Sequence, residues 1–224
     1  MTLVQRLIGW LGFGRDPRRQ QVRLLEQKSS TFPKLSSWEL DPFHSTVGFR
    51  IMHMGLVEVA GRFKNYSAQV RGTSPAFTDL QVEVQIEVAS IETDMAARDA
   101  HLRSPDFFDA EKYPYITFRS TAIRWRPLRR FILEGDLTIK GITHRIQLEG
   151  ELKGLLLKDL VGQPRASFHL TAQIDRRDWG LTWQMETQDG TIVADNIVTL
   201  DITAEITTPE GMQALRQMLA QMGG

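Results

Sequence analysis

The strongest constraint on the fold is the stretch 80–88, in which apolar and polar side chains alternate without a break. The apolar positions are Leu80, Val82, Val84, Ile86 and Val88, and the polar positions between them are Gln81, Glu83, Gln85 and Glu87. Successive side chains of a strand point to opposite faces of its sheet. A period of two therefore predicts a strand with one buried face and one wet face.

Similar alternation in four further stretches makes this an all-β chain. The stretches are 43–53, 131–139, 168–174 and 198–206. An open sheet would leave the backbone groups of its edge strands unpaired, so long strands joined by polar connections favour a closed antiparallel sheet. The length of 224 residues suits one barrel domain with terminal extensions.

One segment, 93–113, interrupts the strand pattern. Asp94 is placed to cap a short helix, which Pro105 then ends. Phe107 and Phe108 follow as a bulky apolar pair. We expect this insert to form a lid or plug over the mouth of the barrel.

Both ends of the chain favour helices. Residues 1–37 are predicted to form an amphipathic helix over 2–13 and a basic linker, residues 38–207 the barrel, and residues 208–224 a C-terminal helix. The apolar face of the first helix would comprise Leu3, Val4, Leu7, Ile8 and Leu11, and that of the last Met212, Leu215, Leu219 and Met222. The last helix is expected to pack against the barrel or against a partner chain, which leaves a homodimer open.

Charge and composition narrow the possible partners. With 27 basic and 27 acidic side chains, no global field attracts nucleic acid, and any electrostatic targeting must be local. The basic residues within 1–28 could bind an anionic membrane surface.

No apolar run approaches the roughly 20 residues of a spanning helix, and residues 1–13 resemble a secretory signal only loosely. We therefore expect a cytoplasmic location, at the inner face of the membrane, with the periplasm as the alternative.

The sequence carries little catalytic chemistry. It has no cysteine, no nucleophile elbow, no phosphate-binding or dinucleotide-binding glycine pattern and no zinc-protease motif. The five histidines offer no set of converging metal ligands, so we predict no metal, no cofactor and no enzyme. By strand alternation His53 points inward with Val47, Phe49 and Ile51, whereas His44 points away. We favour a hydrogen-bonded histidine at the rim of the core over contact with a ligand head group.

Two charged clusters have structural explanations. The first cluster comprises Arg98, Asp99 and His101. We interpret it as a charged helix surface that ties the insert to strand ends, in preference to a general acid/base group. In 175–179, an ion-paired turn stacked on Trp179 accounts for the charges.

An ordered series of short motifs runs through residues 38–207. It begins with a run from Trp38 to Gly55 that contains Asp41-Pro42, His44-Ser45 and His53-Met54, and Gly61-x-Phe63 follows. The later motifs are Ser90-Ile91-Glu92-Thr93, Arg98-Asp99-x-His101-Leu102, Asp106-Phe107-Phe108-Asp109, Tyr113-Pro114-x-Ile116-x-Phe118, Gly135-x-Leu137-Thr138-x-Lys140-Gly141 and Asp178-Trp179-Gly180. These motifs, in this order, resemble the YceI family of bacterial lipid-binding proteins.

The resemblance implies an extended eight-stranded antiparallel lipocalin-like β-barrel that holds a polyisoprenoid, an isoprenoid quinone or a similar lipid, and it implies no catalytic residue. Burying a dozen methylene groups contributes on the order of 10 kcal/mol before ordering costs are subtracted, so such a site needs no strong polar contact. The candidate ligand-binding residues are Val47, Phe49, Ile51, His53, Val82, Val84, Ile86, Leu102, Phe107, Phe108, Phe118 and Leu137.

Two alternatives stay open at this point. One is a lipid-modifying enzyme that uses His53 with Arg98, Asp99 or His101. The other is a structural or interaction module whose barrel is filled by its own side chains. A vacant apolar interior would argue against the second.

Overall fold

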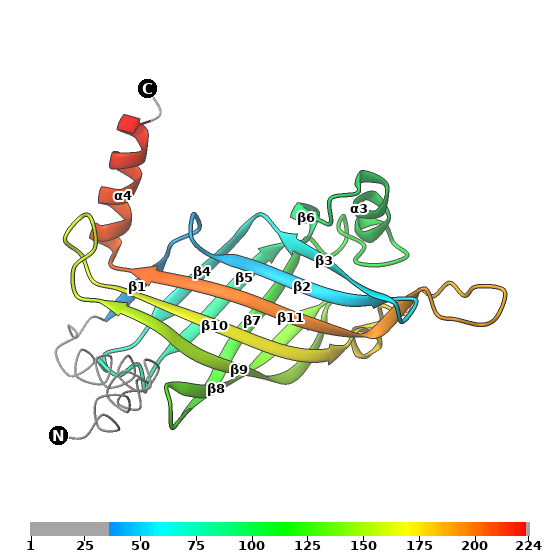
Figure 1. The fold of residues 1–224 in the computed structure, drawn as a ribbon, viewed down its shortest axis with the longest axis horizontal. Helices are drawn as coiled ribbons and strands as arrows, with labels where there is room; N and C mark the ends of the chain where they lie inside the picture. Colours follow the sequence, from blue (N-terminus) through cyan, green and yellow to red (C-terminus); the bar gives the residue numbers. More distant parts are fainter. Residues whose placement is uncertain (1–35, 223–224) are drawn as a thin grey trace, which may run out of the picture.

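The structure, a computed structural model, describes residues 36–222, which form a closed β-barrel with two α-helices (Figure 1). Three of the eight barrel strands are kinked into two segments each. These are β1 (Ser37–Leu40) with β2 (Thr46–His53), β3 (Val57–Phe63) with β4 (Tyr66–Arg71), and β5 (Gln81–Glu87) with β6 (Ile91–Glu92). The other five are β7 (Tyr115–Arg126), β8 (Arg130–Ile139), β9 (Ile142–Leu156), β10 (Arg165–Asp175) and β11 (Ala194–Thr207).

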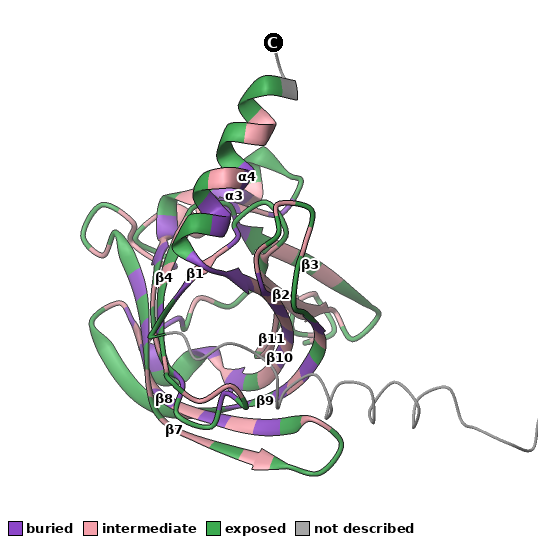
Figure 2. Cartoon of the chain, turned by 90° about the vertical axis from the view of Figure 1, so that its left-hand side faces the viewer, coloured by how far each residue is buried: buried purple, intermediate pink, exposed green. Residues whose placement is uncertain are grey.

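Each barrel strand pairs antiparallel with the next along the chain, and the last pairs with the first. β11 pairs with both β1 and β2 along one edge, and β1 also pairs with β4. Glu39 opposite Thr207 closes the ring, which Figure 2 shows from one end. Closure leaves few backbone groups unpaired. The predicted all-β, eight-stranded antiparallel barrel is therefore confirmed.

The alternating stretches form strands close to their expected limits. The run 80–88 forms β5, but Val88 already lies in a short 3-10 helix over Val88–Ser90. The prediction for 43–53 was wrong at its start, because Phe43 lies in a turn before β2 and is exposed. Asp41 forms this turn by accepting a hydrogen bond from the Phe43 amide at 2.9 Å.

The insert contains the expected helix, α3 (Ala96–Arg103), but its start differs from the prediction. Met95 is the N-cap residue, and Asp94 makes no cap because its backbone is left-handed, with φ 59°. Asp99 instead accepts a hydrogen bond from the Thr93 amide at 2.8 Å, which ties the first turn of α3 to the end of β6. The helix ends at Ser104, as the following Pro105 requires.

The C-terminal helix, α4 (Pro209–Met222), stands at the opposite end of the barrel from α3 and projects away from it (Figure 1). On its predicted apolar face Met212 and Leu215 are buried and Leu219 is half-buried, while the Met222 side chain lies outside the described residues. The predicted helix over 2–13 and the basic linker also lie outside them. Among the residues described, no helix is long and apolar enough to cross a membrane.

Aromatic side chains fill the barrel end next to α4. Phe77, from the loop between β4 and β5, is completely buried and packs against Trp38 and Phe168 with ring centroids 5.4 and 5.5 Å away. The indole of Trp125 donates a hydrogen bond to the Phe77 carbonyl at 2.9 Å. These contacts fill this end of the barrel with apolar side chains.

Candidate binding cavity

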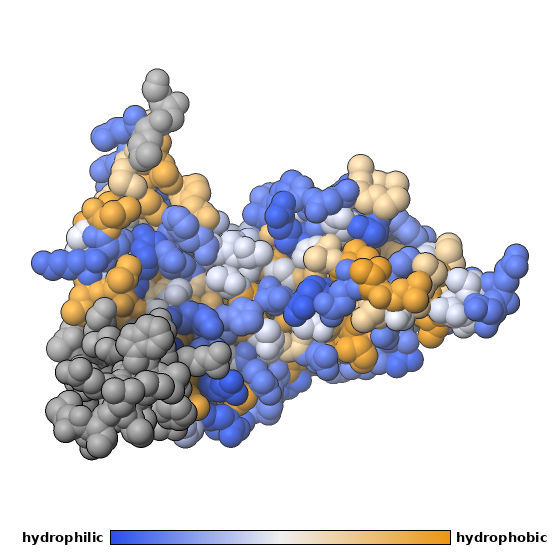
Figure 3. All heavy atoms as spheres, viewed as in Figure 1, coloured by the Kyte–Doolittle hydropathy of each residue, from blue (hydrophilic) through white to orange (hydrophobic). Residues whose placement is uncertain are grey.

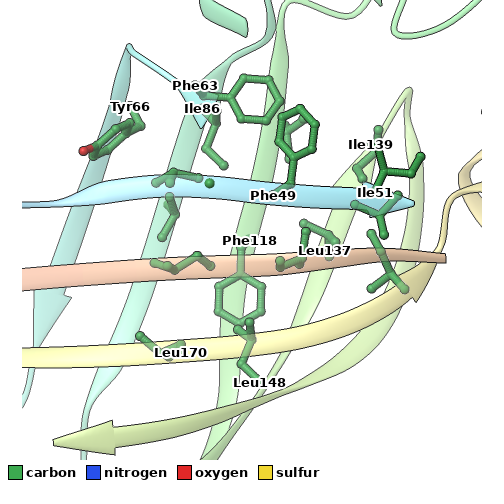
Figure 4. A pocket seen from close by; sticks show the side chains of 18 of the residues that line it. Phe49, Ile51, Phe63, Tyr66, Ile86, Phe118, Leu137, Ile139, Leu148 and Leu170 are labelled. Atoms are coloured by element: carbon green, nitrogen blue, oxygen red, sulfur yellow. The ribbon is translucent and has the colours of Figure 1, made fainter. Parts of the chain in front are cut away.

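A cavity of about 610 Å³ runs through the barrel interior. All eight strands contribute to its wall, and nearly every contributing side chain is apolar (Figure 4). This volume falls within the ordinary range of ligand pockets, about 300–1,000 Å³. The barrel is therefore not filled by its own side chains.

The structure places all twelve predicted ligand-binding residues around this cavity. The alternation assigned each of these strand residues to the correct face of its strand. The prediction omitted wall residues from the second half of the barrel, although the alternation in 168–174 and 198–206 pointed to several of them. The omitted residues include Ile139, Leu148, Phe168, Leu170, Val198, Leu200 and Ile202.

The cavity stays open because large aromatic rings lie against the barrel wall. The Phe49 ring covers Gly61, its partner on the neighbouring strand, so closely that a Cβ on Gly61 would lie 2.3 Å from the ring. Phe131 covers its partner Gly150 in the same way, and Phe118 covers Gly135. Only glycine admits such close approach. The rings therefore coat the wall with apolar surface and leave the centre of the barrel vacant.

The polar groups that reach the wall are mostly bonded to the protein. The Tyr66 hydroxyl donates to the Ser45 carbonyl at 2.7 Å, and burial, with the nearby charge of Asp41, raises the pKa of Tyr66. Buried Arg176 donates to the main-chain carbonyls of Leu181, Trp183, Ala194 and Asp195. Burial lowers the pKa of this arginine. Its bonds tie the 181–194 connection to the barrel and keep its donors occupied.

The cavity reaches the surface beside α3. Met95 and Ala97 line the cavity and are themselves exposed. Across the opening, His101, Phe107 and Trp183 form a cluster in which the ring centroids lie 4.9 to 5.1 Å apart. The insert therefore lies over the cavity, as expected of a lid, and Trp183 from the 181–194 connection contacts it there. Figure 1 shows α3 at the end of the barrel opposite α4.

The charged residues of the insert serve as structural ties. Arg98 donates to the Thr93 hydroxyl at 2.7 Å and to its carbonyl at 2.6 Å, and His101 bonds Asp106 at 3.1 Å. Among residues 36–222, no hydrogen bond joins His53 to Arg98, Asp99 or His101, although His53 shares the cavity wall. The favoured explanation, that this cluster ties the insert to a strand end, is confirmed for Arg98 and Asp99.

The turn at 175–179 follows the prediction in part. Asp175 pairs with Arg177 at 2.5 Å, and this bond holds the pKa of Asp175 at about 2. The turn was also expected to stack on Trp179, but among residues 36–222 no cationic side chain lies over this ring. The Trp179 ring instead meets the edge of His144, with centroids 5.1 Å apart, and its indole donates to the Leu137 carbonyl.

Three side chains have the composition of a metal site, but the positive charge between their carboxylates is supplied by an arginine. Ligand atoms of Asp41, His44 and Glu205 lie within 4.8 Å of one another at the kink between β1 and β2. The guanidinium of Arg165 lies 2.5 Å from both carboxylates and 3.0 Å from Asp159. Although burial raises the pKa of Asp41, hydrogen bonds with His44 and Arg165 outweigh it, and the net shift is downward. We therefore describe the group as a partly buried ion-pair cluster.

Fold and cavity together define a lipocalin-like binding barrel, in which an up-and-down ring of strands surrounds an apolar interior. Residues 38–206 match the YceI-like domain. The chain therefore belongs to the YceI-like family, whose fold is that of a binding domain.

Known relatives agree with this assignment. A UPF0312 protein of Photorhabdus laumondii is 37% identical over 136 residues, which cover 61% of this chain and 70% of the relative. A UPF0312 protein of Staphylococcus epidermidis is 30% identical over 173 residues, 77% of this chain and 98% of the relative.

Solved structures are similar as well. The Campylobacter jejuni YCEI protein has a TM-score of 0.59 and 31% identity, over 69% of this chain and 87% of its own. BcnA of Burkholderia cenocepacia has a TM-score of 0.63 at 22% identity, over 75% of this chain and 99% of its own, and shows likeness of fold alone.

Proposed function

We propose that this protein binds a long-chain isoprenoid, or a similar amphiphilic lipid, inside the barrel and stores or transports it without chemical change. The observation that carries the proposal is the apolar cavity along the barrel, whose lining includes the exposed residues Met95 and Ala97. A dozen buried methylene groups contribute about 10 kcal/mol, which exceeds the lower estimates of the cost of association. Shape and apolar surface are therefore enough for useful affinity.

A protein of similar fold is named for the same class of ligand. A polyisoprenoid binding domain from Saccharophagus degradans has a TM-score of 0.57 to this chain at 15% identity, over 78% of this chain and all of that domain. At this identity the comparison supports the shape of the barrel, and the chemistry of the wall supports a lipid. Polyprenols and isoprenoid quinones are the candidates we favour.

A carboxylate placed on the cavity wall should expel the lipid. In Val84→Glu the new charge faces the apolar interior, where an unpaired carboxylate is costly to bury. In Gln85→Glu, one residue along β5, the same group faces solvent. We expect lipid to co-purify with the wild type and with Gln85→Glu, and to fall at least about tenfold with Val84→Glu, a free-energy change of about 1.4 kcal/mol.

Native mass spectrometry and organic extraction after gentle purification would measure the bound lipid, and circular dichroism would establish that all three proteins are folded. A wild-type protein that never carries lipid would contradict the proposal, as would equal lipid content in both variants.

We also propose that residues 1–28 hold the barrel on an anionic membrane, at the cytoplasmic face. The stretch 15–28 contains five basic and two acidic side chains, namely Arg15, Arg18, Arg19, Arg23, Lys28, Asp16 and Glu26. Each basic residue near an anionic surface contributes about 1 kcal/mol. Replacing Arg18, Arg19 and Arg23 by glutamine in the full chain should abolish salt-sensitive binding to phosphatidylserine vesicles. Unchanged salt-sensitive binding would refute this proposal.

A further inference from the structure

Two chain reversals at the mouth of the barrel carry exposed apolar side chains. Leu56 and Val57 lie at the turn between β2 and β3, with Leu56 79% exposed. Met185 and Ile192 lie on the 181–194 connection, and Met185 is 53% exposed. We call these four residues the mouth tips. Apolar side chains are visible over this end of the β2–β3 hairpin in Figure 3.

The mouth tips form one connected surface that is continuous with the cavity. The Met54 amide donates to the Val193 carbonyl at 3.0 Å, and the Val193 amide donates to the Met185 carbonyl at 2.9 Å, so the two reversals are bonded side by side. Val193, next to Ile192 in sequence, lines the cavity, and so does His53, whose carbonyl accepts a hydrogen bond from the Leu56 amide at 2.9 Å. The tips therefore lie next to residues that line the cavity at this end of the barrel.

We propose that the mouth tips insert into the surface of an uncharged, zwitterionic phospholipid bilayer and bring the cavity mouth against it. The inference rests on the proposed function, because a water-insoluble ligand is exchanged most readily where its path from bilayer to cavity avoids water. Each methylene exposed on that path costs about 0.8 kcal/mol. Exposed apolar side chains on narrow tips suit a deformable lipid surface better than a flat protein interface.

The charges around the tips favour an uncharged membrane. Glu58, next to Val57, is paired with Arg50 at 3.1 Å. Glu186 and Asp189 are exposed on the 181–194 connection and bond only neutral partners, Gln184, Thr187 and Thr191, in the described structure. These two carboxylates would be repelled by anionic lipid. Insertion of the tips into an uncharged surface depends on burial of apolar side chains, which salt does not screen, so it should resist high salt, unlike the binding proposed for residues 1–28.

The absence of cysteine from the chain permits a site-specific test with the full-length protein. A polarity-sensitive fluorophore on Leu56→Cys should shift to the blue when phosphatidylcholine vesicles are added at high salt. The same fluorophore on Leu160→Cys, an exposed position on the loop after β9 at the α4 end, should not respond. Equal responses at both positions, or a response at neither, would overturn the proposal.

Matched substitutions give the second measurement. Leu56→Ser with Met185→Ser should lower flotation with phosphatidylcholine vesicles by about tenfold or more. Leu156→Ser with Leu160→Ser removes similar exposed surface at the α4 end and should change flotation little. If the tip substitutions instead alter the sedimentation mass and leave flotation unchanged, the tips contact a second copy of the chain and the proposal is wrong.

Lipid extraction from the same proteins separates this proposal from the one on which it depends. Bound lipid with no flotation at high salt would refute docking through the tips and leave lipid binding intact. Flotation by a protein that never carries lipid would refute lipid binding.

Discussion

Gly61→Ala should push the Phe49 ring off the barrel wall and into the cavity. The added methyl carbon would lie 2.3 Å from the ring, and the three nearest atoms all belong to this flexible side chain, so the ring moves and the backbone stays. If the ring displaces about four methylene groups of ligand, about 3 kcal/mol of binding is lost. We expect lipid affinity to fall roughly a hundredfold, measured by displacement of a fluorescent lipid analogue.

Two further variants test this explanation. Phe49→Ala in the Gly61→Ala background removes the displaced ring and should restore most of the affinity. Gly154→Ala adds a methyl group on the same barrel, where the one atom of residues 36–222 within 4 Å is the Ser167 hydroxyl oxygen at 3.2 Å, and this variant should bind lipid like the wild type. Full affinity in Gly61→Ala alone would show that the Phe49 ring does not control the capacity of the cavity.

Arg165→Met should destabilise the barrel by about 3–5 kcal/mol, because removing one partner of a buried ion pair leaves the other charges uncompensated. The Arg165 side chain is only 11% exposed and bonds Asp41, Asp159 and Glu205. The matched control is Arg119→Met, which breaks an exposed pair with Glu83 and should cost less than about 1 kcal/mol. Urea unfolding at neutral pH would measure both.

The cost of Arg165→Met should shrink in acid. The pKa of Asp41 and that of Asp159 are lowered from 3.8 in the folded chain. Each carboxylate therefore stabilises the fold fully above its unfolded pKa and loses this contribution as pH falls through its lower, folded pKa. Below pH 3.8 the wild type and Arg165→Met should converge in unfolding free energy. A difference that is constant from pH 7 to pH 3 would exclude this electrostatic account.

The sequence determined which residues face the interior. In β5 and β11, apolar and polar residues alternate so regularly that local chemistry alone assigns Val84 and Ile202 to the interior of the barrel. Side chains of a strand must alternate between its faces, so this information is contained in neighbouring residues and needs no knowledge of strand pairing. The helix of the insert and its end before Pro105 were also predictable from neighbouring residues, whereas the capping role assigned to Asp94 was wrong because its backbone is left-handed.

Whether the interior is solid or vacant was decided only by tertiary structure. The alternating pattern identifies the apolar residues that face inward, but not their partners on the neighbouring strand. The register between strands places Phe49 over Gly61 and Phe131 over Gly150. The same holds for Arg165, whose partner Asp41 is 124 positions away in the chain. Which face a residue takes is a local property of the backbone, whereas the space left inside a barrel depends on contacts between strands that meet only when the ring has closed.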